Sequence, residues 1–113
     1  MESRRGNPPD ITRGSDNVFA DLGYADADER QTKLRLAHAI NQVVGKLGLT
    51  QVESAAVLGI NQPKMSALSR YRLEGFSVER LMNFLTALDC DVDIVIRKKV
   101  GGEQGGRITV VGA

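Results

Sequence analysis

The apolar residues in the first half of the chain recur at helical spacing. Leu36, Ile40, Val43 and Leu47 lie at positions i, i+4, i+7 and i+11, so they form one stripe along a helix. A cluster of acidic residues precedes this stripe, and carboxylates favour the N-terminal end of a helix dipole. We therefore predict a long helix that begins near residue 26 and ends at Gly48, a residue type that suits helix termini.

Two shorter helices are predicted next, each introduced by a capping residue. Thr50 and Glu53 have the spacing of a capping box, and the helix that follows them is expected to stop at Gly59. Asn61 is the expected cap of the next helix. Pro63 falls in the first turn of that helix, where its missing N–H has no cost.

The spacing of apolar residues changes after a fourth predicted helix, which is expected to follow a cap at Ser77 and to end before residue 90. Residues 91–97 alternate with a period of two, which predicts a half-buried strand. Residues 107–111 are a second, short strand candidate. The predicted fold class is a mainly α-helical bundle with a short C-terminal β element.

The distribution of apolar residues also predicts the domain boundaries. The 113 residues, of which 42% are hydrophobic, provide enough apolar surface for one core. Residues 1–16 are polar and are expected to form a flexible tail. Residues 17–99 are predicted to form the folded domain, and residues 100–113 are predicted to be a glycine-rich tail that carries the second strand candidate.

Composition points to a cellular environment but not to a partner. The net charge is +1, so the charge total favours neither an acidic nor a basic ligand. The single cysteine excludes an intrachain disulfide, which is consistent with a reducing, cytoplasmic compartment. No apolar run approaches the roughly 18–20 residues that a membrane span needs, so no membrane partner is expected.

The even balance of charges conceals a basic segment. Residues 61–72 contain Lys64, Arg70 and Arg72 and no acidic residue. A basic segment in a balanced chain is typical of a small nucleic-acid-binding protein. Short charge runs also occur on solvated faces, so charge alone leaves both interpretations open.

Residues 50–70 give this basic segment a structural setting. Two short capped helices are predicted there, joined at Gly59, which can adopt the positive φ of a tight turn. Met65 and Leu68 are spaced to anchor the second helix on the core, which leaves polar and basic side chains on its outer side. This arrangement matches a helix-turn-helix, whose second helix enters the DNA major groove.

Residues spread over 17–97 carry a resemblance to a known family. The matching residues are Asn17, Val18, Phe19, Asp21, Leu22, Gly23, Thr50, Gln51, Glu53, Ala55, Leu58, Gly59, Ile60, Gln62, Pro63, Ser66, Leu68, Gly75, Phe76, Ser77, Arg80, Leu81, Leu85, Ala87, Leu88, Asp91 and Val92. In this pattern the chain resembles the Cro/repressor-type (XRE) helix-turn-helix transcriptional regulators, and more narrowly the HigA-like antitoxins. Tyr71 and Asp89 depart from it, because the family has glycine at these positions.

The resemblance implies a lambda-repressor-like bundle that represses transcription by binding operator DNA specifically. It also implies an antitoxin that neutralises an mRNA-cleaving toxin, represses its own operon and is associated with the nucleoid. One module contacts few bases, so a homodimer that reads two half-sites is expected, with residues 91–97 as the source of pairing. For the assembly, the other interpretation is a monomer in which residues 91–97 and 107–111 pair as a hairpin. The alternative is a protein-interaction module, toxin-neutralising or scaffolding, without specific DNA binding.

The candidate DNA-binding residues are Gln51, Asn61, Gln62, Lys64, Ser66, Arg70 and Arg72. By resemblance, Gln51 is expected to bond a phosphate. The Gln62 amide can pair with adenine, Lys64 can reach guanine or a phosphate, and Ser66 can reach a base edge, a phosphate or its own helix backbone. Asn61 either contacts a base or only caps its helix. Arg70 and Arg72 are either phosphate contacts or solvated cations.

No constellation for catalysis or metal binding is found. His38 has no second histidine or cysteine at ligand spacing, and no nucleophile stands at a readable distance from it in the sequence. Cys90 is expected to be a small buried apolar side chain. We therefore predict no catalytic, metal or cofactor site and do not expect an enzyme.

Overall fold

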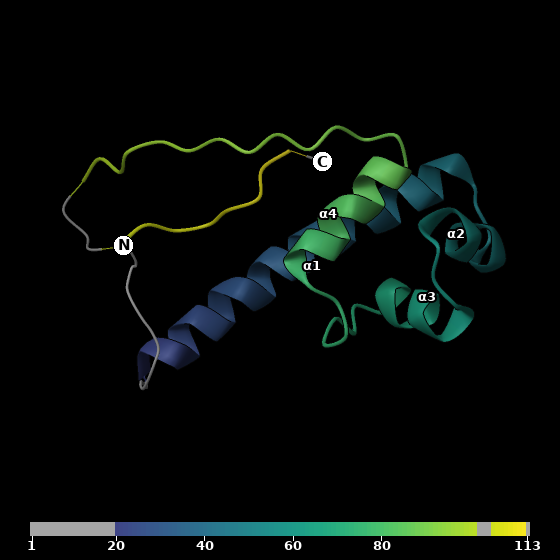
Figure 1. Cartoon of the computed structure of the whole chain (residues 1–113), viewed down its shortest axis with the longest axis horizontal. Coiled ribbons are helices and arrows are strands. Elements are labelled where there is room, and N and C mark those ends of the chain that lie inside the picture. Colours follow the sequence, from purple (N-terminus) through teal and green to yellow (C-terminus); the bar gives the residue numbers. More distant parts are fainter. Residues whose placement is uncertain (1–19, 102–104, 113) are drawn as a thin grey trace. The chain divides into compact units, whose positions relative to one another are not determined.

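The computed structural model of the protein describes residues 20–101 and 105–112, with side chains from residue 27 onward. This part of the chain contains four helices, α1 (Ala20–Leu47), α2 (Gln51–Leu58), α3 (Gln62–Ser69) and α4 (Val78–Ala87) (Figure 1). The chain divides into two units, residues 1–30 and 31–113, so α1 begins in the first and ends in the second. The predicted tail at 1–16 lies outside the described residues.

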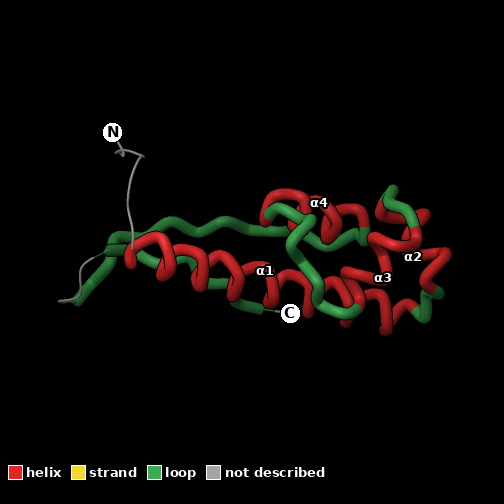
Figure 2. The backbone as a smooth tube through the Cα atoms, turned by 90° about the horizontal axis from the view of Figure 1, so that it is seen from below, coloured by secondary structure: helices red, strands yellow, loops and turns green. Residues whose placement is uncertain are grey.

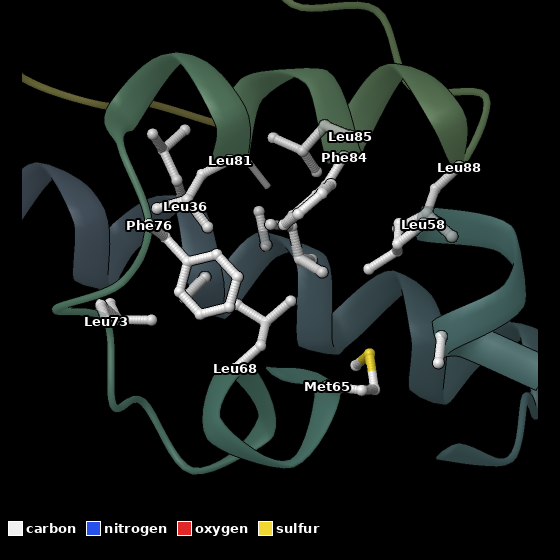
Figure 3. Packing of buried hydrophobic residues seen from close by; sticks show 14 residues of the cluster. Leu36, Leu58, Met65, Leu68, Leu73, Phe76, Leu81, Phe84, Leu85 and Leu88 are labelled. Atoms are coloured by element: carbon white, nitrogen blue, oxygen red, sulfur yellow. The ribbon is translucent and has the colours of Figure 1, made fainter. Parts of the chain in front are cut away.

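One apolar core unites the helices of the second unit. All four helices contribute buried side chains to it, as does the loop between α3 and α4. Figure 3 shows Leu68 of α3 and Phe76 of that loop pointing into the same cluster as Leu81 and Phe84 of α4. The rings of Phe76 and Phe84 meet edge to face with their centroids 5.9 Å apart, an arrangement that adds to the apolar burial.

The three shorter helices begin at the predicted caps. The side chains of Thr50, Asn61 and Ser77 each accept a hydrogen bond from the backbone N–H three residues later. Each cap therefore satisfies one of the amide groups that a helix start leaves without an intrahelical partner. These predicted starts are confirmed.

The long helix begins earlier than predicted. Its first residue is Ala20, so the expected start near residue 26 is wrong. The helix continues through Gly23, because one glycine inside a helix costs only about 1 kcal/mol and does not by itself end it. Its predicted end is confirmed, since Gly48 follows the last helical residue with φ of 67°.

All four helices end in the same way. Each is followed by a residue in the left-handed region, namely Gly48, Gly59, Tyr71 or Asp89, with φ between 63° and 71°. The N–H of this residue bonds the carbonyl three positions back, and the next N–H bonds the carbonyl five positions back. These are the two bonds of a Schellman motif. Tyr71 and Asp89 therefore adopt a backbone conformation that glycine favours, at the positions where the resembled family has glycine.

The C-terminal segment is extended but unpaired. Figure 2 draws its described residues from 90 onward as loop, and the described part of the chain contains no β-strand. The structure does not support the predicted strand at 91–97 or the candidate at 107–111. No backbone hydrogen bond joins these two segments within the described residues. A period of two gives a strand only when a neighbouring backbone pairs with it, and the described residues supply no such partner.

Candidate nucleic-acid interface

The N-terminus of α2 is held in place by a complete capping box. The Thr50 side chain accepts a hydrogen bond from the Glu53 N–H at 3.1 Å, and the Glu53 carboxylate accepts one from the Thr50 N–H at 2.9 Å. Ser54, fully buried, donates its hydroxyl to the Thr50 carbonyl at 2.8 Å. Gln51 is therefore the first residue of a well-fixed helix, with an exposed side chain.

A tight turn sets α3 beside α2. Gly59 has φ of 71°, and a Cβ atom built there would meet no neighbouring atom within 4 Å. The turn is closed by a hydrogen bond of 3.0 Å from the Ile60 N–H to the Ala55 carbonyl. Ala55 is 5% exposed, and its small side chain suits the close approach of the two helices that Figure 1 shows.

One side of α3 is buried and the other faces solvent. Met65 and Leu68 are 1% and 0% exposed, respectively. Asn61 and Gln62, at the N-terminal end, are both exposed. Asn61 acts as the cap, because its side-chain oxygen accepts a hydrogen bond from the Lys64 N–H at 2.9 Å. This bond uses one of the two lone pairs of the Asn61 oxygen, and the amide nitrogen of the same side chain is the donor it can offer to DNA.

The basic end of α3 is exposed and has a defined exit. Arg70 and Arg72 both face solvent, on either side of Tyr71. The Arg72 N–H bonds the Ala67 carbonyl at 2.8 Å, which fixes the direction of the chain after the helix. The Tyr71 hydroxyl lies 3.5 Å from Nδ1 of His38 on α1. Tyr71 thus connects the end of α3 to α1, with 40% of its surface still exposed.

Lys64 has a contact that the sequence did not predict. Its ammonium group donates to the Gly75 carbonyl at 3.3 Å and lies 5.1 Å from the centre of the Phe76 ring. In this position the side chain joins α3 to the loop before α4. Lys64 is half-buried, and its contact with DNA stays a prediction.

The two helices of the motif are also joined by their polar side chains. The Gln51 amide donates to the Ser69 hydroxyl at 3.4 Å, and that hydroxyl donates to the Ser66 carbonyl at 2.9 Å. Gln51 was predicted as a phosphate contact, whereas Ser69 was not among the candidates. Eighteen positions separate the two residues, so only the fold brings them together.

The predicted contacts lie close together in the chain, and most of them are exposed. Gln51, Asn61, Gln62, Arg70 and Arg72 are exposed, while Ser66 is half-buried like Lys64. Six of the seven lie in or beside α3, and Gln51 reaches that helix through Ser69. Their roles at DNA remain predictions.

Neither a metal-binding cluster nor a membrane-spanning helix is found among the described residues. They contain no group of three His, Cys, Asp or Glu side chains that could hold a metal ion. Among the helices, none within the described residues is long and apolar enough to cross a bilayer. Cys90 is half-buried, with its sulfur 4.0 Å from the Leu88 carbonyl.

Comparison with known proteins agrees with this geometry. A family model described as a helix-turn-helix domain (HTH_37) matches residues 18–97, which include all four described helices, α1 to α4. The chain belongs to this helix-turn-helix family. The match also covers every candidate contact residue described above.

A solved structure indicates which group of helix-turn-helix proteins this chain is similar to. It is provisionally described as an XRE family transcriptional regulator and is 64% identical in sequence, with a TM-score of 0.73. The match covers 78% of this chain and 99% of the other. The chain is therefore a member of the XRE group of helix-turn-helix regulators, as the sequence resemblance implied. No significant match is found among curated proteins.

Proposed function

We propose that the protein is a transcriptional repressor that binds a specific operator with α3 in the major groove. The observation that carries the proposal is the composition of the exposed side of α3. Residues 61–72 contain three basic side chains and no carboxylate, and the apolar residues Met65 and Leu68 face the core. A phosphate backbone attracts such a surface.

The two ends of α3 have different tasks in this proposal. Gln62 lies at the N-terminal end, where an exposed amide can pair with the N6 and N7 atoms of adenine. Arg70 and Arg72 lie at the other end, where guanidinium groups suit phosphates and fix the register of the helix on DNA. Gln51 at the N-terminus of α2 supports a further phosphate contact, because helix N-termini favour anions.

The repressor acts as a homodimer in this proposal. A single helix-turn-helix reads too few base pairs for useful specificity. Two copies related by a two-fold axis would read half-sites about 10 bp apart, or a multiple of this spacing.

The test compares two variants of α3. Gln62→Ala is expected to weaken the binding free energy for the operator by about 1–3 kcal/mol and to change binding to random DNA little, because only base recognition is lost. Arg70→Ala is expected to weaken binding to both kinds of DNA and to reduce the slope of log K against log salt by about one unit. Titration of labelled duplexes at several salt concentrations measures both effects.

Arg107→Ala is the matched control. Arg107 is exposed like Arg70 but lies beyond residues 18–97. Its removal should leave both the operator affinity and the salt slope at wild-type values. If Gln62→Ala and Arg70→Ala bind as the wild type does at every salt concentration, α3 does not read DNA, and the protein is better described as an interaction module.

A finer proposal is that this repressor is the antitoxin of a toxin–antitoxin operon. Its support is the resemblance of the lead-in at Asn17, Val18 and Phe19 to HigA-like antitoxins. Inducible expression of the neighbouring reading frame tests it. That frame should arrest growth when expressed alone, and co-expression of this chain should restore growth. A harmless neighbour would refute the antitoxin role and leave the repressor role intact.

A further inference from the structure

The hydroxyl of Ser69, the last residue of α3, forms two hydrogen bonds. It donates to the Ser66 carbonyl at 2.9 Å and accepts a bond from the side-chain nitrogen of Gln51 in α2 at 3.4 Å. A serine hydroxyl has one proton, so once that proton is given to Ser66 the oxygen can only accept from Gln51. The Ser69 side chain therefore connects the backbone of α3 to a side chain of α2.

This bonding pattern fixes which end of the Gln51 amide faces α3. A glutamine amide has a nitrogen that donates and an oxygen that accepts, and its orientation follows from the groups around it. Because the Ser69 hydroxyl can only accept, the Gln51 nitrogen is turned toward it. One N–H of that nitrogen is used in this bond, and the planar amide directs its second N–H away from Ser69.

A DNA phosphate is an acceptor that suits the second N–H. Phosphate oxygens only accept hydrogen bonds, and side-chain amides are among the groups that contact them in protein–DNA complexes. Gln51 is exposed, whereas Ser69 is half-buried. The exposed glutamine is therefore the residue that can reach the DNA backbone, and the less exposed serine is the residue that can hold it.

Ser69 itself is not suited to the phosphate. Its only proton is given to the Ser66 carbonyl, so its hydroxyl has no donor left for an oxygen that only accepts. A role confined to the end of α3 would need this local bond and not the contact with Gln51, eighteen positions away in the sequence.

We propose that Ser69 is a positioning residue, which holds the Gln51 amide so that its second N–H meets a phosphate of the DNA backbone. Gln51 makes the contact, and Ser69 acts only through it. The inference rests on the phosphate contact of Gln51 in the proposed function and names the residue that prepares it. A side chain that is already held loses less conformational freedom on binding, which strengthens the complex.

A double-mutant cycle tests whether Ser69 acts through Gln51. The probe is a labelled duplex of random sequence at low salt, because a phosphate contact does not depend on base sequence. Gln51→Ala is expected to weaken binding about tenfold, as the loss of a hydrogen bond to a charged group does. Ser69→Ala is expected to weaken it about threefold, since one side chain loses its fixed orientation. In the Gln51→Ala background, Ser69→Ala should have no further effect.

Two further variants separate this role from a structural one. Ser69→Thr keeps the hydroxyl and should bind DNA as the wild type does. Thr86→Ala is the matched control, because the Thr86 hydroxyl also bonds the carbonyl three positions back, at 2.7 Å, but lies in α4. It should leave the DNA affinity at the wild-type value. A loss of affinity in Ser69→Ala that Ser69→Thr does not restore would overturn the proposal.

A measurement without DNA reports the contact itself. In NMR spectra of the full chain, Ser69→Ala should move the side-chain NH2 resonances of Gln51. Those of Gln31, an exposed glutamine of α1, should stay in place. Unchanged Gln51 resonances would overturn the proposal, whatever the DNA titrations show.

The outcomes distinguish this inference from the proposed function. If Ser69→Ala weakens binding equally with and without the Gln51 side chain, or does not weaken it at all, Ser69 does not position Gln51 and the proposal is wrong. If Gln51→Ala binds as the wild type does while Arg70→Ala binds weakly, the proposal is wrong and the repressor role stands. A wild-type protein that binds no duplex would refute both.

Discussion

Replacement of glycine by alanine should change the stability of the protein in opposite directions at Gly59, in the turn of the motif, and at Gly45, inside α1. Gly59 ends α2 with φ of 71°, and Gly45 lies inside α1 with ordinary helical geometry. A Cβ atom built at either position meets nothing within 4 Å. The added methyl group therefore contacts no neighbouring residue at either site, and the difference between the two variants isolates the backbone conformation.

The expected magnitudes follow from this geometry. An L-residue in the left-handed region costs about 1–2 kcal/mol, and the loss of glycine's freedom in the unfolded chain returns about 0.5–1 kcal/mol. Gly59→Ala should therefore destabilise the protein by about 1 kcal/mol. Gly45→Ala should stabilise it by about 0.5–1 kcal/mol, because alanine favours the helix and restricts the unfolded chain.

Urea denaturation followed by the helical circular dichroism signal measures both changes. The protein concentration must be the same throughout, because self-association of any protein makes its apparent stability depend on concentration. The slope of free energy against urea should stay constant, so that the midpoints report stability alone. If the urea midpoints of both variants shift in the same direction, or if Gly59→Ala is as stable as the wild type, the left-handed turn does not constrain residue 59 and the reasoning is refuted.

Three further predictions concern α3. Lys64→Met removes the bond to Gly75 and the cation over the Phe76 ring, so it should lower thermal stability by about 1 kcal/mol in a melting experiment; an unchanged midpoint would contradict this. Asn61→Ala should lower the free energy of unfolding, measured by urea denaturation, by about 1 kcal/mol because the cap is lost. Asn61→Asp should retain the cap but bind the operator more weakly in titration, because the added negative charge repels phosphate. Leu68→Ala removes a side chain that is 0% exposed, and denaturation should show a loss of about 2–5 kcal/mol; a loss below 1 kcal/mol would place Leu68 outside the core.

Local features of the fold were predictable from sequence because their partners are close in the chain. Thr50, Asn61 and Ser77 each bond an N–H three residues later, so a short stretch of sequence contains both members of the interaction. The start of α1 was missed for a related reason. Glycine at position 23 resembles a stop signal in a short window, but a long helix has enough bonds on both sides to continue through it.

Features that depend on distant partners were not predictable. Lys64 meets a carbonyl eleven positions away, and Gln51 meets a hydroxyl eighteen positions away. Both contacts depend on how the helices pack, which sequence spacing does not reveal. The predicted strand at 91–97 illustrates the same point, because its alternation describes the segment and leaves its partner unspecified.

The way α3 is anchored has a consequence for how such regulators diverge. Of its eight residues, the two that are buried are Met65 and Leu68. The start of the helix is held by the Asn61 cap and its end by the backbone bonds around Tyr71. Gln62 is exposed, and substitutions at such surface positions usually change stability by less than about 0.5 kcal/mol. A duplicated copy of this protein can acquire a new operator by substitution at exposed positions of α3 while its scaffold stays the same.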